Sequence, residues 1–391
     1  MRILSIETSC DETAIAVLDI SGGTQAPKIK KLAHSVASQI ELHQKYGGVF
    51  PMMAKREHSK NFVPLLLETL SEAKILQKKN SQLATSDTKK LGKILEREPE
   101  LLVELLKMLP TIKTPKFDCI AVTTGPGLEP ALWVGINAAR ALATYWDIPL
   151  VPVNHMEGHI LSVLLQQSKI TSAKIQFPAL ALLVSGGHTE LVLMKDWMHY
   201  KKIGQTRDDA AGEAFDKVAR MLDLPYPGGP RISKLAEEHR GKIEIPKKYT
   251  LPRPMLHSDN FDFSFSGLKT AVLYMLREIP KKTDLIKKHI AHEFENAVVE
   301  VLTHKTLRAL EKYKAATLIV GGGVAANKHL RTILTHTVTE LMPQTQIYFP
   351  DKELTTDNAL MIGIAGYFQF LKKKKKGTRE SALKAVGNLE L

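Results

Sequence analysis

The chain has 391 residues, two cysteines and a formal net charge of +13 at pH 7. This length predicts two or three domains with cores of their own, and no apolar run approaches the ~20 residues of a membrane span. Two cysteines exclude a disulfide framework and are typical of a reducing compartment. The sequence enters a strand at Met1–Ile6 without a signal segment, so we expect a cytoplasmic protein that does not contact a membrane.

The positive charge favours a polyanionic partner, although for any single lysine solvated surface is the preferred interpretation. The lysines concentrate over residues 74–116 and in the run Lys372 to Lys376.

The first element predicted is a hairpin. Residues 2–18 show a strand, a small polar turn and a second strand. Asp11 and Glu12 stand at the turn, where either is a candidate proton acceptor. The alternative is that they only shape the turn.

Residues 76–116 are polar and lysine-rich and contain apolar residues at helical spacing from Leu91 to Leu109. Such a helix could dock a partner, but we favour packing on its own domain. A strand and glycine loop follow at 119–127, and then a predicted helix over 131–145. Glycine turns followed by helices leave backbone N–H groups that suit anions.

The stretch Val151–His159 places two imidazoles, His155 and His159, four residues apart. On a helix they share one face, within reach of one metal ion. Glu157 lies two residues after the first histidine and points away from that face, unlike the glutamate of a zinc-protease H-E-x-x-H motif. This position argues against a metallopeptidase.

The second half repeats the first. Residues 179–194 again show a strand, a small polar turn and a strand, and residues 317–327 form a strand and glycine loop before a helix from Lys328. The repetition predicts two α/β halves around a cleft that binds a phosphate group.

Ten blocks, in order over about residues 1–371, together resemble one family. They are Ile6–Thr13, Gly47–Pro51, Thr124–Leu128, His155–His159, Leu183–Thr189, Asp208–Lys217, Tyr226–Pro230, Phe261–Lys269, Gly321–Asn327 and Thr356–Asn358. The sequence is similar to the universal tRNA threonylcarbamoyladenosine transferases, and specifically to the bacterial TsaD type. Relative to the usual pattern, the region around residues 76–110 looks like an insertion.

The resemblance implies a duplicated actin/hexokinase/Hsp70-like fold (ASKHA, RNase H-like) with two lobes around a nucleotide cleft. We expect a first lobe at 1–152, with a helical insertion at 76–116 and completed by a C-terminal helix at 356–371. We expect a second lobe at 153–355 and a basic, mobile tail at 372–391.

The implied reaction transfers threonylcarbamoyl from threonylcarbamoyl-AMP to N6 of the adenosine 3′ to the anticodon, in tRNAs that read codons starting with A. The implied partners are tRNA, a TsaB-type paralogous subunit, a TsaE-type ATPase and a TsaC-type synthase that supplies the donor.

The resemblance also assigns site residues. Asp357 joins His155 and His159 as ligand of one divalent metal, with Fe(2+) favoured and Zn(2+) also suited; without the family, Asp357 would be read as a helix N-cap. The residues that match the family's positions for the substrate or nucleotide, threonylcarbamoyl-AMP or ATP, are Leu183, Val184, Ser185, Gly186, Gly187, Asp216, Gly229 and Asn327.

Two further alternatives remain. One is a kinase or ATPase of the same superfold, since the fold does not fix the chemistry; no sugar-kinase signature is present. The other is a non-catalytic scaffold, which would not need metal ligands and nucleotide loops together.

Overall fold

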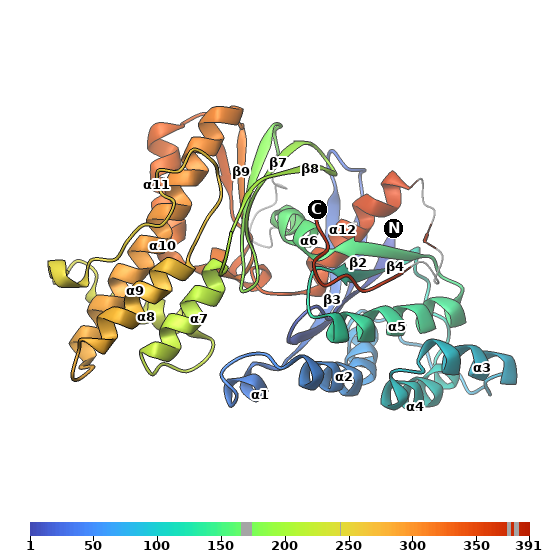
Figure 1. Cartoon of the computed structure of the whole chain (residues 1–391). Helices are drawn as coiled ribbons and strands as arrows, with labels where there is room; N and C mark the ends of the chain where they lie inside the picture. The colour runs from blue at the N-terminus through green and yellow to red at the C-terminus, as the bar shows by residue number, and fades with distance from the viewer. Residues whose placement is uncertain (166–173, 243, 374–376, 379–382) are drawn as a thin grey trace. The chain divides into compact units, whose positions relative to one another are not determined.

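The structure, a computed structural model of the chain, describes residues 1–165, 174–242, 244–373, 377–378 and 383–391. The chain divides into two compact units (Figure 1). The first comprises residues 1–42, 49–172 and 357–391, and the second comprises residues 43–48 and 173–356.

The first unit is built on a five-stranded sheet in the order β3-β2-β1-β4-β5. Its strands β1, β2 and β3 are antiparallel, whereas β4 and β5 run parallel to β1. The strands are β1 Arg2–Glu7, β2 Glu12–Ser21, β3 Lys28–Ser38, β4 Cys119–Gly125 and β5 Leu150–Asn154.

Helices cover both faces of this sheet. Successive side chains of a strand point to opposite faces, so strands that are apolar at successive positions need cover on both. Leu4 and Ile6 of β1 join the core that is shared with α2 and α5, whereas Ser5, between them, faces α12. Two glycines let α12 approach closely: a Cβ on Gly366 would lie 2.4 Å from the Cβ of Ala121. The helices with residues in this part of the chain are α1 Ile40–Gln44, α2 Pro51–Glu72, α3 Thr85–Ile94, α4 Pro99–Met108, α5 Glu129–Trp146, α6 His155–Leu161 and α12 Ala359–Lys372.

The second unit repeats this topology, with its sheet in the order β10-β9-β6-β7-β8. Here β6, β7 and β8 are antiparallel, and β9 and β10 are parallel to β6. Its strands are β6 Ala179–Val184, β7 Thr189–Asp196, β8 His199–Gln205, β9 Thr317–Gly321 and β10 Gln346–Tyr348. Its helices are α7 Ala211–Met221, α8 Gly228–His239, α9 Ser266–Arg277, α10 Asp284–Tyr313 and α11 Lys328–Leu341. The expected duplication, both hairpins and both strand–loop–helix units are therefore confirmed.

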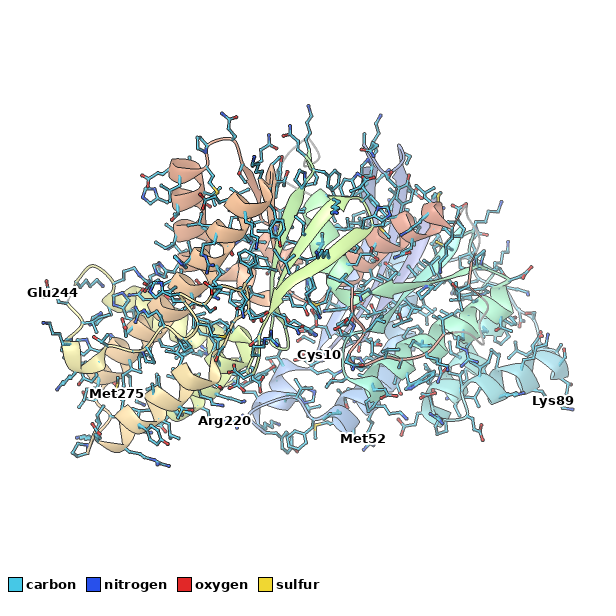
Figure 2. All side chains as sticks on the ribbon, turned by 45° about the horizontal axis from the view of Figure 1, so that its top comes forward. Cys10, Met52, Lys89, Arg220, Glu244 and Met275 are labelled. Carbon is cyan, nitrogen blue, oxygen red and sulfur yellow. The ribbon has the colours of Figure 1, made fainter. Side chains whose placement is uncertain are left out.

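The expected helix from Leu91 to Leu109 is wrong in one respect, because the structure has two helices there. Pro99 lacks the N–H that a continuous helix would need and instead begins α4. Leu91, Leu95, Leu101 and Leu105 are buried in the core of the first unit, so packing on its own domain is confirmed. Figure 2 shows Lys89 of α3 on the outer side of this helix pair, where it is exposed.

The two ends of this excursion meet. Lys78 and Ile112 form an antiparallel bridge, and Lys79 N donates to Thr111 O at 2.8 Å. The helix pair thus leaves and rejoins the unit at one point; that residues 76–116 are an insertion stays a prediction.

Two expected boundaries change. Residues 153–165 belong to the first unit rather than to the second, since α6 continues directly from β5 and packs against α12. The expectation of a mobile tail is wrong for residues 383–391, where Leu383 and Ala385 are buried in the core of the first unit. Residues 374–376 and 379–382 lie outside the described part.

Candidate metal centre and substrate-binding residues

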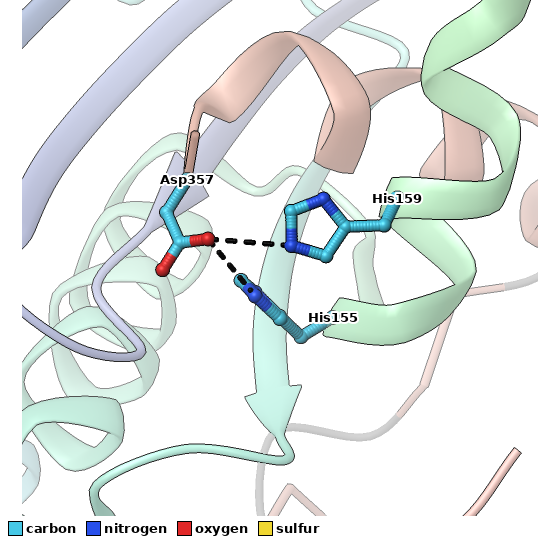
Figure 3. A group of neighbouring side chains, drawn as sticks. All are labelled: His155, His159 and Asp357. Atoms are coloured by element: carbon cyan, nitrogen blue, oxygen red, sulfur yellow. Dashed lines mark ion pairs between the residues drawn. The ribbon is translucent and has the colours of Figure 1, made fainter. Parts of the chain in front are cut away.

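His155 and His159 come from α6, which begins immediately after β5 (Figure 3). Asn154 caps this helix, because its Oδ1 accepts hydrogen bonds from the backbone N–H groups of Met156 at 2.8 Å and Glu157 at 3.3 Å. The helical spacing places both imidazoles on one face, as predicted.

Asp357 faces the two histidines from the segment before α12. Its Oδ1 lies 3.2 Å from His155 Nε2 and 3.3 Å from His159 Nε2 (Figure 3). The reading of Asp357 as an N-cap is wrong, because Asn358 caps α12 by accepting from Met361 N at 3.0 Å. The carboxylate of Asp357 is therefore directed to the histidines.

These three residues meet the requirements of a metal site. Their ligand atoms all lie within 4.8 Å of one another. His159 Nε2 is buried and makes no hydrogen bond of acceptable geometry to any described residue, although Asp357 Oδ1 is near. Two imidazoles and one carboxylate that leave positions open suit Fe(II) or Zn(II). This set constitutes a possible His/Asp metal site.

Glu7 supports His155 from behind. Its buried Oε2 accepts from Thr123 Oγ1 at 2.6 Å and lies 3.1 Å from His155 Nδ1. A proton on Nδ1 that is donated to this carboxylate leaves Nε2 free as the ligand atom. Sequence reasoning missed Glu7, although a carboxylate at the end of the strand β1, next to Ile6, was a usable signal.

Charge in the site favours a cation. Burial would raise the pKa of Asp357, but the two histidines outweigh it and hold that pKa well below its usual range. Burial would lower the pKa of His155, but Asp357 and Glu7 outweigh it and raise that pKa well above its usual value. Burial lowers the pKa of His159. A metal ion would replace the proton that these groups otherwise share.

Asp11 and Glu12 lie at the turn between β1 and β2, as predicted. Buried His58 holds this turn, with its Nδ1 2.7 Å from Thr13 Oγ1 and its Nε2 3.0 Å from Cys10 O. Burial, followed by the Asp11 carboxylate, raises the pKa of Glu12 to about 10. The role of Asp11 or Glu12 as proton acceptor stays a prediction.

The first glycine loop does not leave its backbone donors open. Gly127 N donates to Gly387 O at 3.0 Å, and Leu128 N donates to Ser9 O at 2.7 Å. The expectation of free N–H groups for an anion is wrong at these two residues, because the chain itself supplies the acceptors.

The eight residues predicted to bind substrate or nucleotide lie in the second unit, around the carboxyl ends of β6 and β9. Leu183 and Val184 are buried within β6, whereas Gly186 and Gly187 are exposed at the turn. Helix α7 braces this turn, since Gly212 N donates to Ser185 O and a Cβ on Gly212 would lie 2.5 Å from that oxygen.

The other three predicted residues are Asp216, Gly229 and Asn327. Asp216, a residue of α7, accepts at Oδ1 from Gly228 N, the first residue of α8, at 2.7 Å. A Cβ on Gly229 would meet open space. Asn327 caps α11, and its Nδ2 donates to Ser233 Oγ at 2.9 Å and Glu295 Oε1 at 2.7 Å. Asp216 and Asn327 thus hold the starts of α8 and α11, and their contact with a nucleotide stays a prediction.

The sequence blocks Asp208–Lys217 and Phe261–Lys269 contact each other through hydrogen bonds and ion pairs. Asp208 Oδ1 accepts from the backbone N–H groups of Phe265 at 2.8 Å and Ser266 at 3.1 Å. Asp209 pairs with Lys217 at 2.9 Å and Lys269 at 2.7 Å. These contacts fix the start of α9 against α7, which accounts for the charged residues in both blocks.

Comparison with known proteins identifies the family. The TsaD family, described as tRNA N6-adenosine threonylcarbamoyltransferase, matches residues 30–87 and 96–364.

The chain belongs to this family.

The unmatched residues 88–95 fall within the helix pair α3–α4. The tRNA N6-adenosine threonylcarbamoyltransferase of Staphylococcus epidermidis is 41% identical over 100% of this chain and 97% of its own length. The proteins of the same name from Staphylococcus carnosus and Chromobacterium violaceum are 43% and 42% identical; each alignment covers 94% of this chain, with 91% and 92% of the relatives.

A solved structure shows the same fold. Full-length HypF in its phosphate- and nucleotide-bound form aligns with a TM-score of 0.53 at 11% identity, over 96% of this chain and 56% of HypF. Together with the duplicated sheets, this likeness confirms the ASKHA-type α/β fold. None of the helices in the described residues combines the length and apolar character needed to cross a bilayer.

Proposed function

We propose that this chain transfers the threonylcarbamoyl group from threonylcarbamoyl-AMP to N6 of the adenosine 3′ to the anticodon, in tRNAs that read codons starting with A. The observation that carries the proposal is the convergence of His155, His159 and Asp357, in a chain that aligns end to end with tRNA N6-adenosine threonylcarbamoyltransferases.

The chemistry asks for positioning rather than for phosphoryl transfer. The donor is a mixed anhydride and is already activated, so the adenosine amine forms an N–C bond to its carbonyl and AMP leaves. Binding both substrates in one geometry supplies much of the rate, and charge on the carbonyl and the leaving phosphate needs stabilisation. Asp11 and Glu12 are the two candidates to accept the proton lost by the amine.

A divalent metal held by His155, His159 and Asp357 would supply Lewis-acid stabilisation of the donor. We favour Fe(2+), and Zn(2+) also suits this ligand set. Glu7 orients His155, and both histidines are buried. The turn Ser185–Gly187 offers exposed backbone to the nucleotide of threonylcarbamoyl-AMP or ATP in the second unit.

We further propose that the chain acts with a TsaB-type subunit, a TsaE-type ATPase and a TsaC-type synthase in the cytoplasm. The experiment is nucleoside analysis of tRNA incubated with the protein, threonine, bicarbonate, ATP and these three partners. The modified adenosine should form with the intact protein and be lost when His155 and His159 are both replaced by Ala. Equal product from the double variant would remove the metal centre from the reaction.

A further inference from the structure

The segment Leu383–Leu391 is seated on the first unit beside the metal ligands. Leu383 and Ala385 are buried in the core of that unit. Val386 N donates to Thr124 O at 2.9 Å, and Gly387 O accepts from Gly127 N at 3.0 Å. We refer to residues 383–391 as the strap.

The glycine loop after β4 is shaped to receive this strap. Gly125 has a φ of +147°, and a Cβ there would lie 2.0 Å from Val386 O. A side chain at this position would therefore push the strap away. This contact gives the loop a purpose other than anion binding.

The side-chain amide of Asn154 connects the strap to α6, the helix of the metal ligands: its oxygen bonds α6 and its nitrogen bonds the strap. Its Oδ1 caps α6 through Met156 N and Glu157 N. Its Nδ2 donates to Glu390 O at 3.1 Å and to Leu389 O at 3.5 Å. The amide cannot rotate without losing hydrogen bonds at both ends, and the next residue is the metal ligand His155.

We propose that Asn154 is a positioning residue and that the strap, by holding its amide, fixes α6 in the orientation that brings His155 and His159 to Asp357. Helix α6 has only 7 residues, so few of its own hydrogen bonds resist a change of direction at its start. Groups that hydrogen-bond directly to a metal ligand typically change metal affinity 10- to 100-fold when they are removed. Asn154 acts on the ligands through the start of α6, so we expect an effect at the lower end of this range.

Two changes test the strap from opposite sides. Asn154→Ser keeps a good N-cap oxygen but lacks the amide donor. A chain that ends at Asn388 removes the carbonyls of Leu389 and Glu390 but keeps Gly387 O, which accepts from Gly127 N, and the buried Leu383 and Ala385. Asn388→Ser is the matched control. It makes the same Asn-to-Ser change at a residue of the strap whose side chain is exposed.

Metal affinity is measured by titrating the metal-free proteins with Co2+ and following its visible absorption, which also reports the coordination geometry. We expect Asn154→Ser and the truncation each to weaken Co2+ binding about tenfold, and their combination to weaken it no further, since both break one link. Amide hydrogen exchange should quicken in α6 and stay unchanged in the second unit. The control should bind as the unchanged protein does.

Affinities within twofold of the unchanged protein for both variants would overturn the inference, as would effects that multiply in the combination. The inference rests on the proposed metal site but not on the proposed reaction. A parent protein that binds no Co2+ would contradict the metal centre itself, whereas a parent that binds and variants that bind equally would contradict the strap alone.

Discussion

Glu7 determines which nitrogen of His155 faces the metal site. Glu7 Oε1 accepts a hydrogen bond from Ser9 N. Glu7 Oε2 accepts one from Thr123 Oγ1 and lies within hydrogen-bond distance of His155 Nδ1. Because every one of these partners can donate, the carboxylate is satisfied only as an acceptor. When the Nδ1 proton of His155 is donated to Glu7, Nε2, which faces Asp357, is the atom that would bind a metal ion.

Replacing Glu7 by Gln should weaken metal binding by about 10- to 100-fold. The amide has nearly the same shape, but its oxygen is held by the donor Ser9 N and its NH2 group then faces His155 Nδ1. Nδ1 must accept from that group, which moves the ring proton to Nε2, the ligand atom. Competition with a chromophoric chelator for Zn2+ measures the change. Asp19→Asn is the matched control, since Asp19 pairs with Arg2 at 3.0 Å on the same sheet. Equal affinities would show that Glu7 does not orient the ligand.

The metal ligands differed in how far the sequence could place them. The spacing of His155 and His159 already placed two rings on one face of a helix. Asp357 lies far along the chain, and its position before α12 fitted an N-cap; only the family resemblance joined it to the histidines. Glu7 and Asn154 escaped because their roles depend on partners that are distant in sequence.

The helix pair α3–α4 shows where periodicity succeeds and where it stops. The apolar spacing identified the buried face, but it continued across Pro99 and so suggested one helix instead of two. The edge strands β3 and β8 were not predicted, because half-exposed residues interrupt the apolar pattern. Packing on the neighbouring sheet decides such elements.

Leu101→Ala and Leu105→Ala in α4 should each lower the free energy of unfolding by about 2–5 kcal/mol, because both side chains are fully buried. Val103→Ala in the same helix should change it by less than about 0.5 kcal/mol, since Val103 is 49% exposed. Urea unfolding gives all three values. A small loss at the two leucines would favour a docking role for the helix pair.

Histidines between α8 and α10 should make the protein sensitive to acid. Buried His239 and His292 face each other with Nδ1 atoms 3.0 Å apart, and His289 stacks on Tyr249. Burial, then Arg240, lowers the pKa of His292 to about 4. Burial also lowers the pKa of His239 and His289, with Lys288 and His239 as the respective next causes.

A folded-state pKa below that of the unfolded chain means that stability is fully present above about pH 6.5 and falls as the pH drops toward 4. For His292 the loss between pH 6.5 and 5 should be on the order of 2 kcal/mol. Urea unfolding at these two pH values should show a smaller loss for His292→Gln than for the unchanged protein. The exposed His336→Gln should not alter the loss. Identical pH dependence in all three proteins would exclude the cluster as its source.

At the scale of the whole molecule, the net charge was the least specific sequence feature. It indicates a polyanionic partner but does not show which surface binds it. The net charge of +13 is spread over surface lysines of both units, and the two concentrations differ in setting. Lys89, Lys90 and Lys93 belong to the α3 helix. The run Lys372 to Lys376 begins at the end of α12, the helix that follows the metal ligand Asp357.

With tRNA as the acceptor, the run Lys372 to Lys376 should contact phosphates. It places five consecutive positive charges directly after α12, the helix that follows the metal ligand Asp357. Each contact releases counterions, so log affinity should fall against log salt with a slope of roughly −0.7 to −0.9 per contact. Changing these five lysines to Gln should flatten the slope by several such increments while the same adenosine is modified, since phosphate contacts do not specify sequence.

The matched variant changes Lys89, Lys90 and Lys93 to Gln and should leave the slope unchanged. Filter binding of tRNA across a salt series, with the partner subunits present, measures all three proteins. Substitutions are preferable to deletion of residues 372–391, because deletion would also remove the buried Leu383 and Ala385 and the strap. A slope that flattens only in the α3 variant would place the tRNA phosphates on the helix pair instead. A slope that is unchanged in both would show that other cations of the molecule bind the RNA.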